Sequence, residues 1–244
     1  MAQTDRPQVL VLGPEERARA LSSRLSLLGC CRGLPAADLE GALRAQAAAP
    51  RAFAVGFLAS DHGLPDLSRT LQRVGEWAAS SGIRWVAFGP RPGPEACAGL
   101  REAGVQFSLF DPNSDEELRF VAGLALHGGD HAHPRAEERM PADLPARILT
   151  RNGEKVALIH NLSATGAYVA TPRPTLRGGT VRLHFALPAR EVQLDAQVLW
   201  NNVPGNLRRL HAPIGMGLRF VAVPPDVERA LTAWVEERGR SYRL

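Results

Sequence analysis

The 244-residue sequence predicts two domains of different class, an α/β domain followed by an all-β domain. In residues 1–126, short continuous apolar runs alternate with helical patterns, which is typical of a doubly wound parallel sheet. In residues 135–244, apolar and polar residues alternate along successive segments, which is typical of half-buried antiparallel strands. Between them, residues 127–134 read HGGDHAHP, and the two glycines and the proline predict a linker.

The first domain is expected to contain five strand–helix units. Clear apolar runs predict strands at residues 9–13, 53–59, 83–89 and 105–110. Helical patterns follow at residues 14–28, 67–79, 93–103 and 113–126. Pro14 suits a helix start, and Asn113 or Ser114 can cap the last helix. A weaker strand and helix fit between residues 30 and 48, which completes the (βα)5 order.

The second domain is expected to be a small closed or nearly closed barrel of six antiparallel strands. Alternating segments predict strands at residues 144–150, 155–162, 167–171, 180–187, 191–200 and 214–221. A C-terminal amphipathic helix then starts at residues 224–226, with Val227, Leu231 and Trp234 on one face. That face is expected to pack over the barrel or against the first domain.

Composition points to a soluble globular chain. Hydrophobic residues make up 45% and charged residues 22%, no apolar run approaches the roughly 20 residues that span a bilayer, and the N-terminus has no signal-peptide core. We therefore expect a cytoplasmic protein without a membrane partner. Three cysteines give no disulfide framework, and Cys30 and Cys31 are interpreted as small apolar residues in or beside a strand.

The net charge of +4 is concentrated in the second half of the chain. Residues 1–126 carry 13 Arg against 14 Asp and Glu, whereas residues 127–244 carry 16 Lys and Arg against 11 Asp and Glu. This imbalance suits a partner that carries phosphates but is too diffuse to indicate DNA by itself.

Two polar elements of the second half suit a small anionic nucleotide. The first, RAEER at Arg135 to Arg139, supplies two guanidinium forks that match phosphate oxygens or the O6/N7 edge of guanine. The second, NLSATG at Asn161 to Gly166, supplies short polar side chains and a glycine where the backbone turns.

With 21 residues between Arg139 and Asn161, the two elements resemble the signature of PilZ domains, a family whose ligand is the bacterial second messenger cyclic di-GMP. The resemblance extends to Val198-Leu199-Trp200, and to residues 215–220, which look like the family's closing G-x-G-x-x-F strand. Each short pattern is weak alone, but their order and spacing in an all-β context form a specific joint signal.

The resemblance implies that cyclic di-GMP is bound by Arg135, Arg139, Asn161, Ser163 and Gly166. The two arginines would lie on an arm that folds over the ligand, often a stacked dimer of cyclic di-GMP. Asn161 would meet a base, Ser163 would donate to a phosphate or brace the turn, and Gly166 would allow a close approach. The alternatives are that the arginines are solvated linker charges and that Asn161 and Ser163 only form a turn. No other cofactor is implied.

The first domain is similar in its order of elements to response-regulator receiver domains, but its residues depart from receiver chemistry. The acidic pair Glu15 and Glu16 comes one step late, and Asp61 follows the third expected strand, residues 53–59, rather than ending it. Residues 110–112 read Phe-Asp-Pro where receivers have Lys-Pro, which reverses the charge beside a phosphate. We interpret this domain as a pseudo-receiver that serves protein interaction or dimerisation rather than phosphorylation.

Three functions stay open at this point. The first is a cyclic di-GMP effector that controls a protein partner through the receiver-like domain, with motility, exopolysaccharide or development as possible outputs. The second is a ligand-independent adaptor. The third, a DNA-binding regulator, is disfavoured because no helix carries clustered arginines and lysines. An enzyme is not expected, because no nucleophile–base pair stands out and the histidines His127, His131 and His133 suit a linker better than a metal site.

Overall fold

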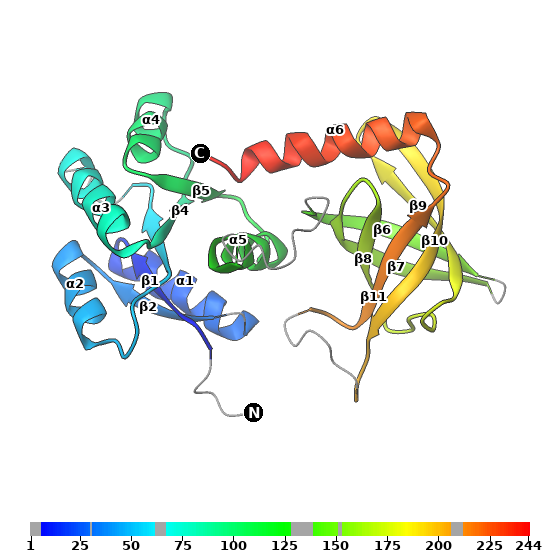
Figure 1. Ribbon diagram of the computed structural model, residues 1–244, viewed down its shortest axis with the longest axis horizontal. Helices are drawn as coiled ribbons and strands as arrows, with labels where there is room; N and C mark the ends of the chain where they lie inside the picture. The colour runs from blue at the N-terminus through cyan, green and yellow to red at the C-terminus, as the bar shows by residue number, and fades with distance from the viewer. Residues whose placement is uncertain (1–5, 30, 62–66, 128–138, 151–152, 206–211) are drawn as a thin grey trace. The chain divides into compact units, whose positions relative to one another are not determined.

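The computed structural model describes residues 6–29, 31–61, 67–127, 139–150, 153–205 and 212–244 (Figure 1). Contacts divide the chain into two compact units: Met1–His133 together with Arg240–Leu244, and Pro134–Gly239. The predicted second domain extends to residue 244, whereas the structure groups the last five residues with the first unit. Most of the predicted linker, and Arg135 with it, lies outside the described residues.

The first unit is built on a parallel five-stranded sheet in the order β2-β1-β3-β4-β5, the order of doubly wound flavodoxin-like folds. Its strands are β1 (Gln8–Leu12), β2 (Arg32–Ala36), β3 (Val55–Ala59), β4 (Arg84–Gly89) and β5 (Val105–Phe110). Every residue of β3 is buried, as expected for a central strand covered on both faces. The predicted receiver-like α/β fold of five units is confirmed, including the weaker second strand.

Helices cover both faces of this sheet (Figure 1). One face carries α1 (Glu15–Leu28) and α5 (Asp115–His127), and the other carries α2 (Leu39–Ala48), α3 (Leu67–Ser81) and α4 (Pro94–Glu102). Asp38 caps α2 by accepting a hydrogen bond from the Gly41 amide at 2.6 Å. The helix α1 begins at Glu15, one residue after the predicted first helical position, with Pro14 as its N-cap.

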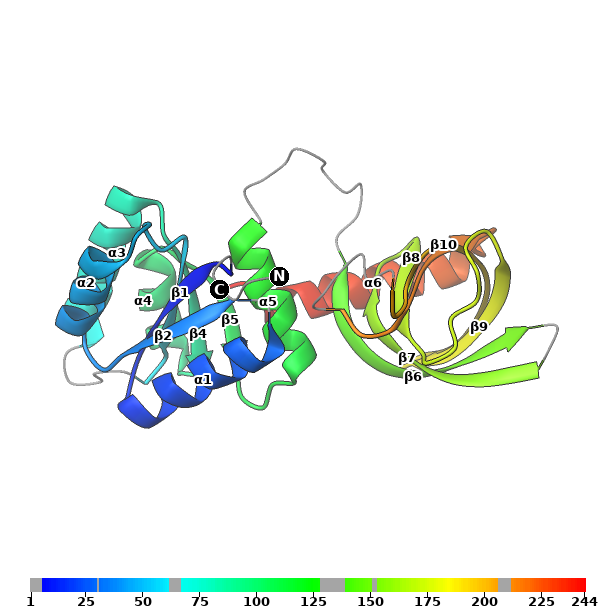
Figure 2. The same cartoon turned by 90° about the horizontal axis from the view of Figure 1, so that it is seen from below.

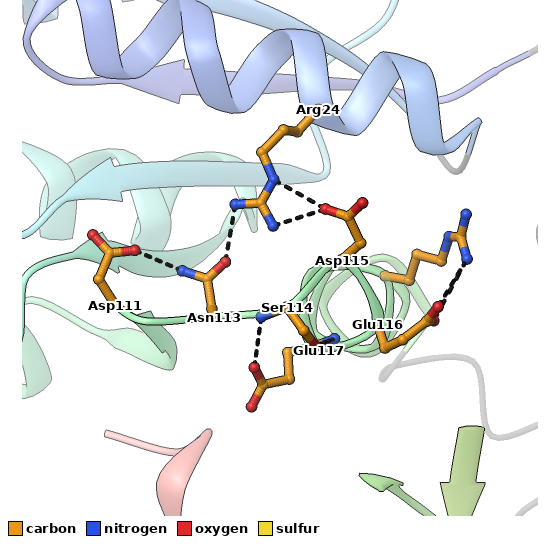
Figure 3. Close-up of polar contacts among 8 residues, drawn as sticks. Arg24, Asp111, Asn113, Ser114, Asp115, Glu116 and Glu117 are labelled. Carbon is orange, nitrogen blue, oxygen red and sulfur yellow. Dashed lines mark hydrogen bonds and ion pairs between the residues drawn. The ribbon is translucent and has the colours of Figure 1, made fainter. Parts of the chain in front are cut away.

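The start of α5 is fixed by a capping box and by an arginine from α1 (Figure 3). The Ser114 amide donates to Glu117 Oε2 at 2.8 Å, and the Glu117 amide donates to Ser114 Oγ at 3.2 Å. Arg24 donates to Asn113 Oδ1 at 3.0 Å and to Asp115 Oδ1 at 2.9 Å. These bonds hold α1 beside the first turn of α5.

The second unit is a closed six-stranded barrel in the order β10-β11-β8-β7-β6-β9 (Figure 2). Its strands are β6 (Met140–Thr150), β7 (Gly153–Leu162), β8 (Gly166–Ala170), β9 (Thr180–Leu187), β10 (Arg190–Asn202) and β11 (Gly215–Val221). Side chains alternate between buried and exposed along β9, which matches the period-two pattern of the sequence. The predicted barrel is confirmed, although β6 begins at Met140 rather than at residue 144.

The C-terminal helix α6 (Pro225–Ser241) packs on the barrel along the predicted face. Val227 and Leu231 are buried in the barrel core, and Trp234 packs against it. An ion pair of 2.7 Å between Arg190 and Asp226 holds the first turn of the helix to β10. Within the described residues, no helix has the length and apolar character needed to cross a membrane.

Candidate functional site

Strand pairing in the barrel brings the two polar elements of the sequence to one place. In the antiparallel β6–β7 ladder, Met140 lies opposite Leu162 and Pro141 lies opposite Asn161. Arg139 directly precedes Met140, and Ser163 directly follows Leu162. The end of the R-x-x-x-R element therefore meets the N-x-S-x-x-G element at the same end of the hairpin. Arg135, the other arginine of the predicted site, lies outside the described residues.

Ser163 braces the turn between β7 and β8. Its amide donates to the Gly166 carbonyl at 2.8 Å, and its hydroxyl both donates to that carbonyl and accepts from the Gly166 amide at 3.1 Å. The residue is only 1% exposed. Its hydroxyl therefore acts on the turn, which is one of the two roles expected from the sequence.

Gly166 allows two backbones to approach more closely than a side chain permits. A Cβ atom added at this residue would lie 2.3 Å from the carbonyl oxygen of Leu218 on β11. The same turn is tied to β11 by the Phe220 amide, which donates to the Thr165 carbonyl at 2.8 Å. The close approach expected at Gly166 is present, and it serves the packing of β8 against β11.

Asn161 presents a polar atom that the described structure leaves unsatisfied. It follows an irregularity in the β7–β8 ladder, which shifts register between Ile159 and Asn161. Its Oδ1 atom is buried and has no hydrogen-bond partner among the described residues. A buried amide oxygen without a partner costs about 1–3 kcal/mol, so this position favours an additional donor.

A row of aromatic side chains lies beside Asn161, which pairs with Tyr168 across the β7–β8 ladder. The Tyr168 and Trp200 rings stack with centroids 5.0 Å apart and planes 13° apart, and His160 meets Tyr168 edge-on at 5.8 Å. The absence of a side chain at Gly217 leaves room for the Trp200 ring, because a Cβ atom added at Gly217 would come within 2.1 Å of the indole. This stack was not predicted from the sequence. The sequence feature that could have indicated the stack is Gly217, a glycine in β11 that lies between aromatic residues of the two neighbouring strands.

The receiver-like unit carries an ion pair where receivers gather carboxylates. Arg17 Nη1 lies 2.8 Å from Asp61 Oδ2, while Glu15 pairs with Arg19 on the exposed side of α1. Asp111, after β5, accepts a hydrogen bond from Asn113 at 2.8 Å (Figure 3). The part of the chain that the structure describes contains no group of three His, Cys, Asp or Glu residues that could hold a metal ion. His131 and His133 lie outside it.

Comparison with known proteins assigns the second half of the chain. Residues 133–237 match the family model of the PilZ domain, and this part of the chain is a PilZ domain. No curated protein matched the chain.

Solved structures similar to each half were also found. The Bacillus subtilis inhibitor of motility MotI/DgrA is 23% identical over 44% of this chain and 52% of its own, with a TM-score of 0.38, so the chain spans about half the length of that protein. The PilZ domain of YcgR from Escherichia coli, described with c-di-GMP, is 20% identical over 44% of this chain and 93% of its own, with a TM-score of 0.34. The receiver domain of an HD domain-containing protein from Pseudomonas fluorescens is 23% identical over 55% of this chain and 97% of its own, with a TM-score of 0.44.

Proposed function

We propose that the protein is a cyclic di-GMP-binding effector or adaptor of bacterial signal transduction. The observation that supports the proposal is the β6–β7 register within a PilZ domain, in which Met140, the residue after Arg139, lies opposite Leu162, the residue before Ser163. Similarity to the PilZ domain of YcgR, described with c-di-GMP, agrees with this ligand. Arg135, Arg139, Asn161, Ser163 and Gly166 form the proposed site.

The geometry gives these residues different tasks. Arg135 and Arg139 contact phosphates or guanine edges, because a guanidinium donates two parallel hydrogen bonds and stacks on a purine face. Asn161 offers its unsatisfied buried oxygen to a donor of the ligand. Ser163 and Gly166 hold the turn in shape through their mutual hydrogen bonds rather than by touching the ligand.

Ligand binding is proposed to order the Arg135–Arg139 arm and to change the orientation of the two units. Such a disorder-to-order step is a common way for a small molecule to control a larger assembly. The receiver-like unit then presents its surface to a protein partner. Scattering profiles that are identical without ligand and at saturating cyclic di-GMP would contradict the orientation change.

Calorimetric titration of the whole chain with cyclic di-GMP tests the binding site. Arg139→Ala is expected to weaken binding by about 2–3 kcal/mol, or roughly 30–150-fold, as for truncation of a hydrogen-bonded charge pair. The matched control is Arg229→Ala, which removes the same charge at an exposed position of α6 and should leave affinity within about twofold. Equal losses in both variants would show a diffuse charge effect, and no binding by the unaltered chain would refute the proposal.

A ligand-independent adaptor is the second candidate. It is favoured by Ser163, whose hydroxyl is buried and already bonded to Gly166. This candidate predicts an intact barrel that gives no heat with cyclic di-GMP at any concentration up to about 1 mM.

A further inference from the structure

The C-terminal residues pair with the open edge of the parallel sheet through an isolated β-bridge. β5 is the last strand of that sheet, so its outer side would otherwise carry unpaired backbone groups. The Ser108 amide donates to the Tyr242 carbonyl at 3.0 Å, and the Leu244 amide donates to the Gln106 carbonyl at 3.3 Å. The contact is antiparallel, with Phe107 opposite Arg243. We call residues 241–244 the C-terminal tail.

Tyr242 anchors the tail. It is 4% exposed, its ring lies 5.5 Å from the Phe120 ring, and its hydroxyl donates to Glu117 Oε1 at 2.7 Å. The other oxygen of Glu117 accepts from the Ser114 amide in the capping box of α5 (Figure 3). The tail is therefore held by backbone bonds to β5 and by one buried aromatic side chain on α5, which is how extended peptides bind sheet edges.

The last turn of α6 contacts the place where the arginine arm enters the barrel. Arg238 Nε donates to the Pro141 carbonyl at 3.4 Å. A Cβ added at Gly239 would lie 3.0 Å from the Met140 Cε, and Met140 is 1% exposed. Met140 follows Arg139 directly, and Gly239 is joined to Tyr242 by only two residues. The end of the arm is thus linked to the tail by the contact between Met140 and Gly239 and by the short stretch of chain from Gly239 to Tyr242.

We infer that the edge of β5 with α5 is a peptide-binding site, that the C-terminal tail is its ligand within the same chain, and that the start of β6 controls its release. This inference rests on the proposed function in one step. Cyclic di-GMP bound by Arg139 moves Met140 against Gly239, and this movement weakens the binding of the C-terminal tail to β5 and α5. The vacated edge then accepts an extended segment of a protein partner that carries a tyrosine-like anchor. The receiver-like unit's output is thereby the exposure of an edge strand rather than a phosphorylation event.

The first test uses a fluorescent peptide of residues 236–244 and measures its binding by anisotropy. A chain ending at Arg240 is expected to bind the peptide, and the full chain at least about tenfold more weakly, because the tethered tail competes at high effective concentration. The peptide with Tyr242→Ala should lose at least about tenfold in affinity, as expected for a central anchor. Equal peptide binding to both chains, or no dependence on Tyr242, overturns the inference.

A hydrogen-exchange measurement on the full chain covers the case in which the shortened chain does not fold. The Ser108 amide should exchange at least about tenfold faster in Tyr242→Ala than in the unaltered chain, since its acceptor is the Tyr242 carbonyl. Arg240→Ala, at an exposed neighbouring position, is the control and should leave this rate unchanged. Unchanged protection in Tyr242→Ala would show that the tail is not held by its anchor.

The control of release by ligand is tested by repeating the peptide titration on the full chain with saturating cyclic di-GMP. Affinity for the peptide is expected to rise toward that of the shortened chain. Calorimetry on the same sample separates two failures. If cyclic di-GMP does not bind, the proposed function is wrong, and the peptide site is then tested only by the peptide titration of the chain that ends at Arg240. If cyclic di-GMP binds and peptide affinity is unchanged, the release step is wrong.

Discussion

Gly166→Ala is the substitution that most directly tests how the candidate site is built. The added Cβ would lie 2.3 Å from the Leu218 carbonyl oxygen, whereas ordinary contact begins at 3.4 Å, so β8 and β11 must separate by about 1 Å. Overpacking of this kind costs about 1–3 kcal/mol, and a strained ladder hydrogen bond adds about 1 kcal/mol. We expect the barrel to lose about 3 kcal/mol.

Differential scanning calorimetry of the full chain measures this loss. For a domain of roughly 100 residues, about 3 kcal/mol lowers the barrel's melting temperature by on the order of 10–20 °C. The control is Gly123→Ala in α5, where nothing lies within 4 Å of an added Cβ and alanine favours the helix. A Gly166→Ala barrel that melts within about 1 °C of the unaltered chain and binds cyclic di-GMP normally would refute the argument.

Three further predictions concern the rest of the structure. Ser114→Ala removes the hydroxyl that caps α5 and should destabilise the receiver-like unit by about 1 kcal/mol in thermal unfolding, with the barrel unaffected. Hydrogen bonds from Arg182 hold the pKa of Asp195 below its usual range, so this pair stabilises the barrel above the unfolded carboxyl's pKa of about 4 and the effect is lost as pH falls through the folded value. Arg182→Ala should therefore raise the pKa of Asp195, followed by NMR, into the usual range of an aspartate, and an unchanged midpoint would show that another group sets the pKa. Because Arg17 forms an ion pair with the Asp61 carboxylate, the full chain should bind no beryllofluoride in the presence of Mg²⁺. Saturable binding would show that the chemistry of receiver domains is retained.

Local patterns were sufficient to predict the elements of both units. Buried strands such as β3 read as continuous apolar runs, and barrel strands such as β9 alternate, because these periods follow directly from which faces are covered. The helix face of Val227 and Leu231 was predicted for the same reason. These features depend on residues that are close in the sequence.

Features that depend on register or on distant partners were not predictable in this way. Periodicity does not show that the segments of Arg139 and Ser163 end at the same end of the β6–β7 hairpin, which the ladder determines, and only the family resemblance indicated it. The bonding of Ser163 to Gly166 is also specific to the folded turn. The C-terminal tail is too short and too polar to produce a strand pattern, so its pairing with β5 becomes visible only in three dimensions.

Cyclic di-GMP is proposed to bind where the Arg135–Arg139 arm enters the barrel beside the β7–β8 turn. The most direct test is an NMR titration of the isotope-labelled full chain, following backbone amides as ligand is added. The amides of Arg139, Ser163 and Gly166 are expected to shift together along one saturable curve, and Arg139→Ala is expected to move that curve to roughly 30–150-fold higher ligand concentration. Saturable shifts confined to the receiver-like unit, or none in the barrel at saturating ligand, would contradict this proposal.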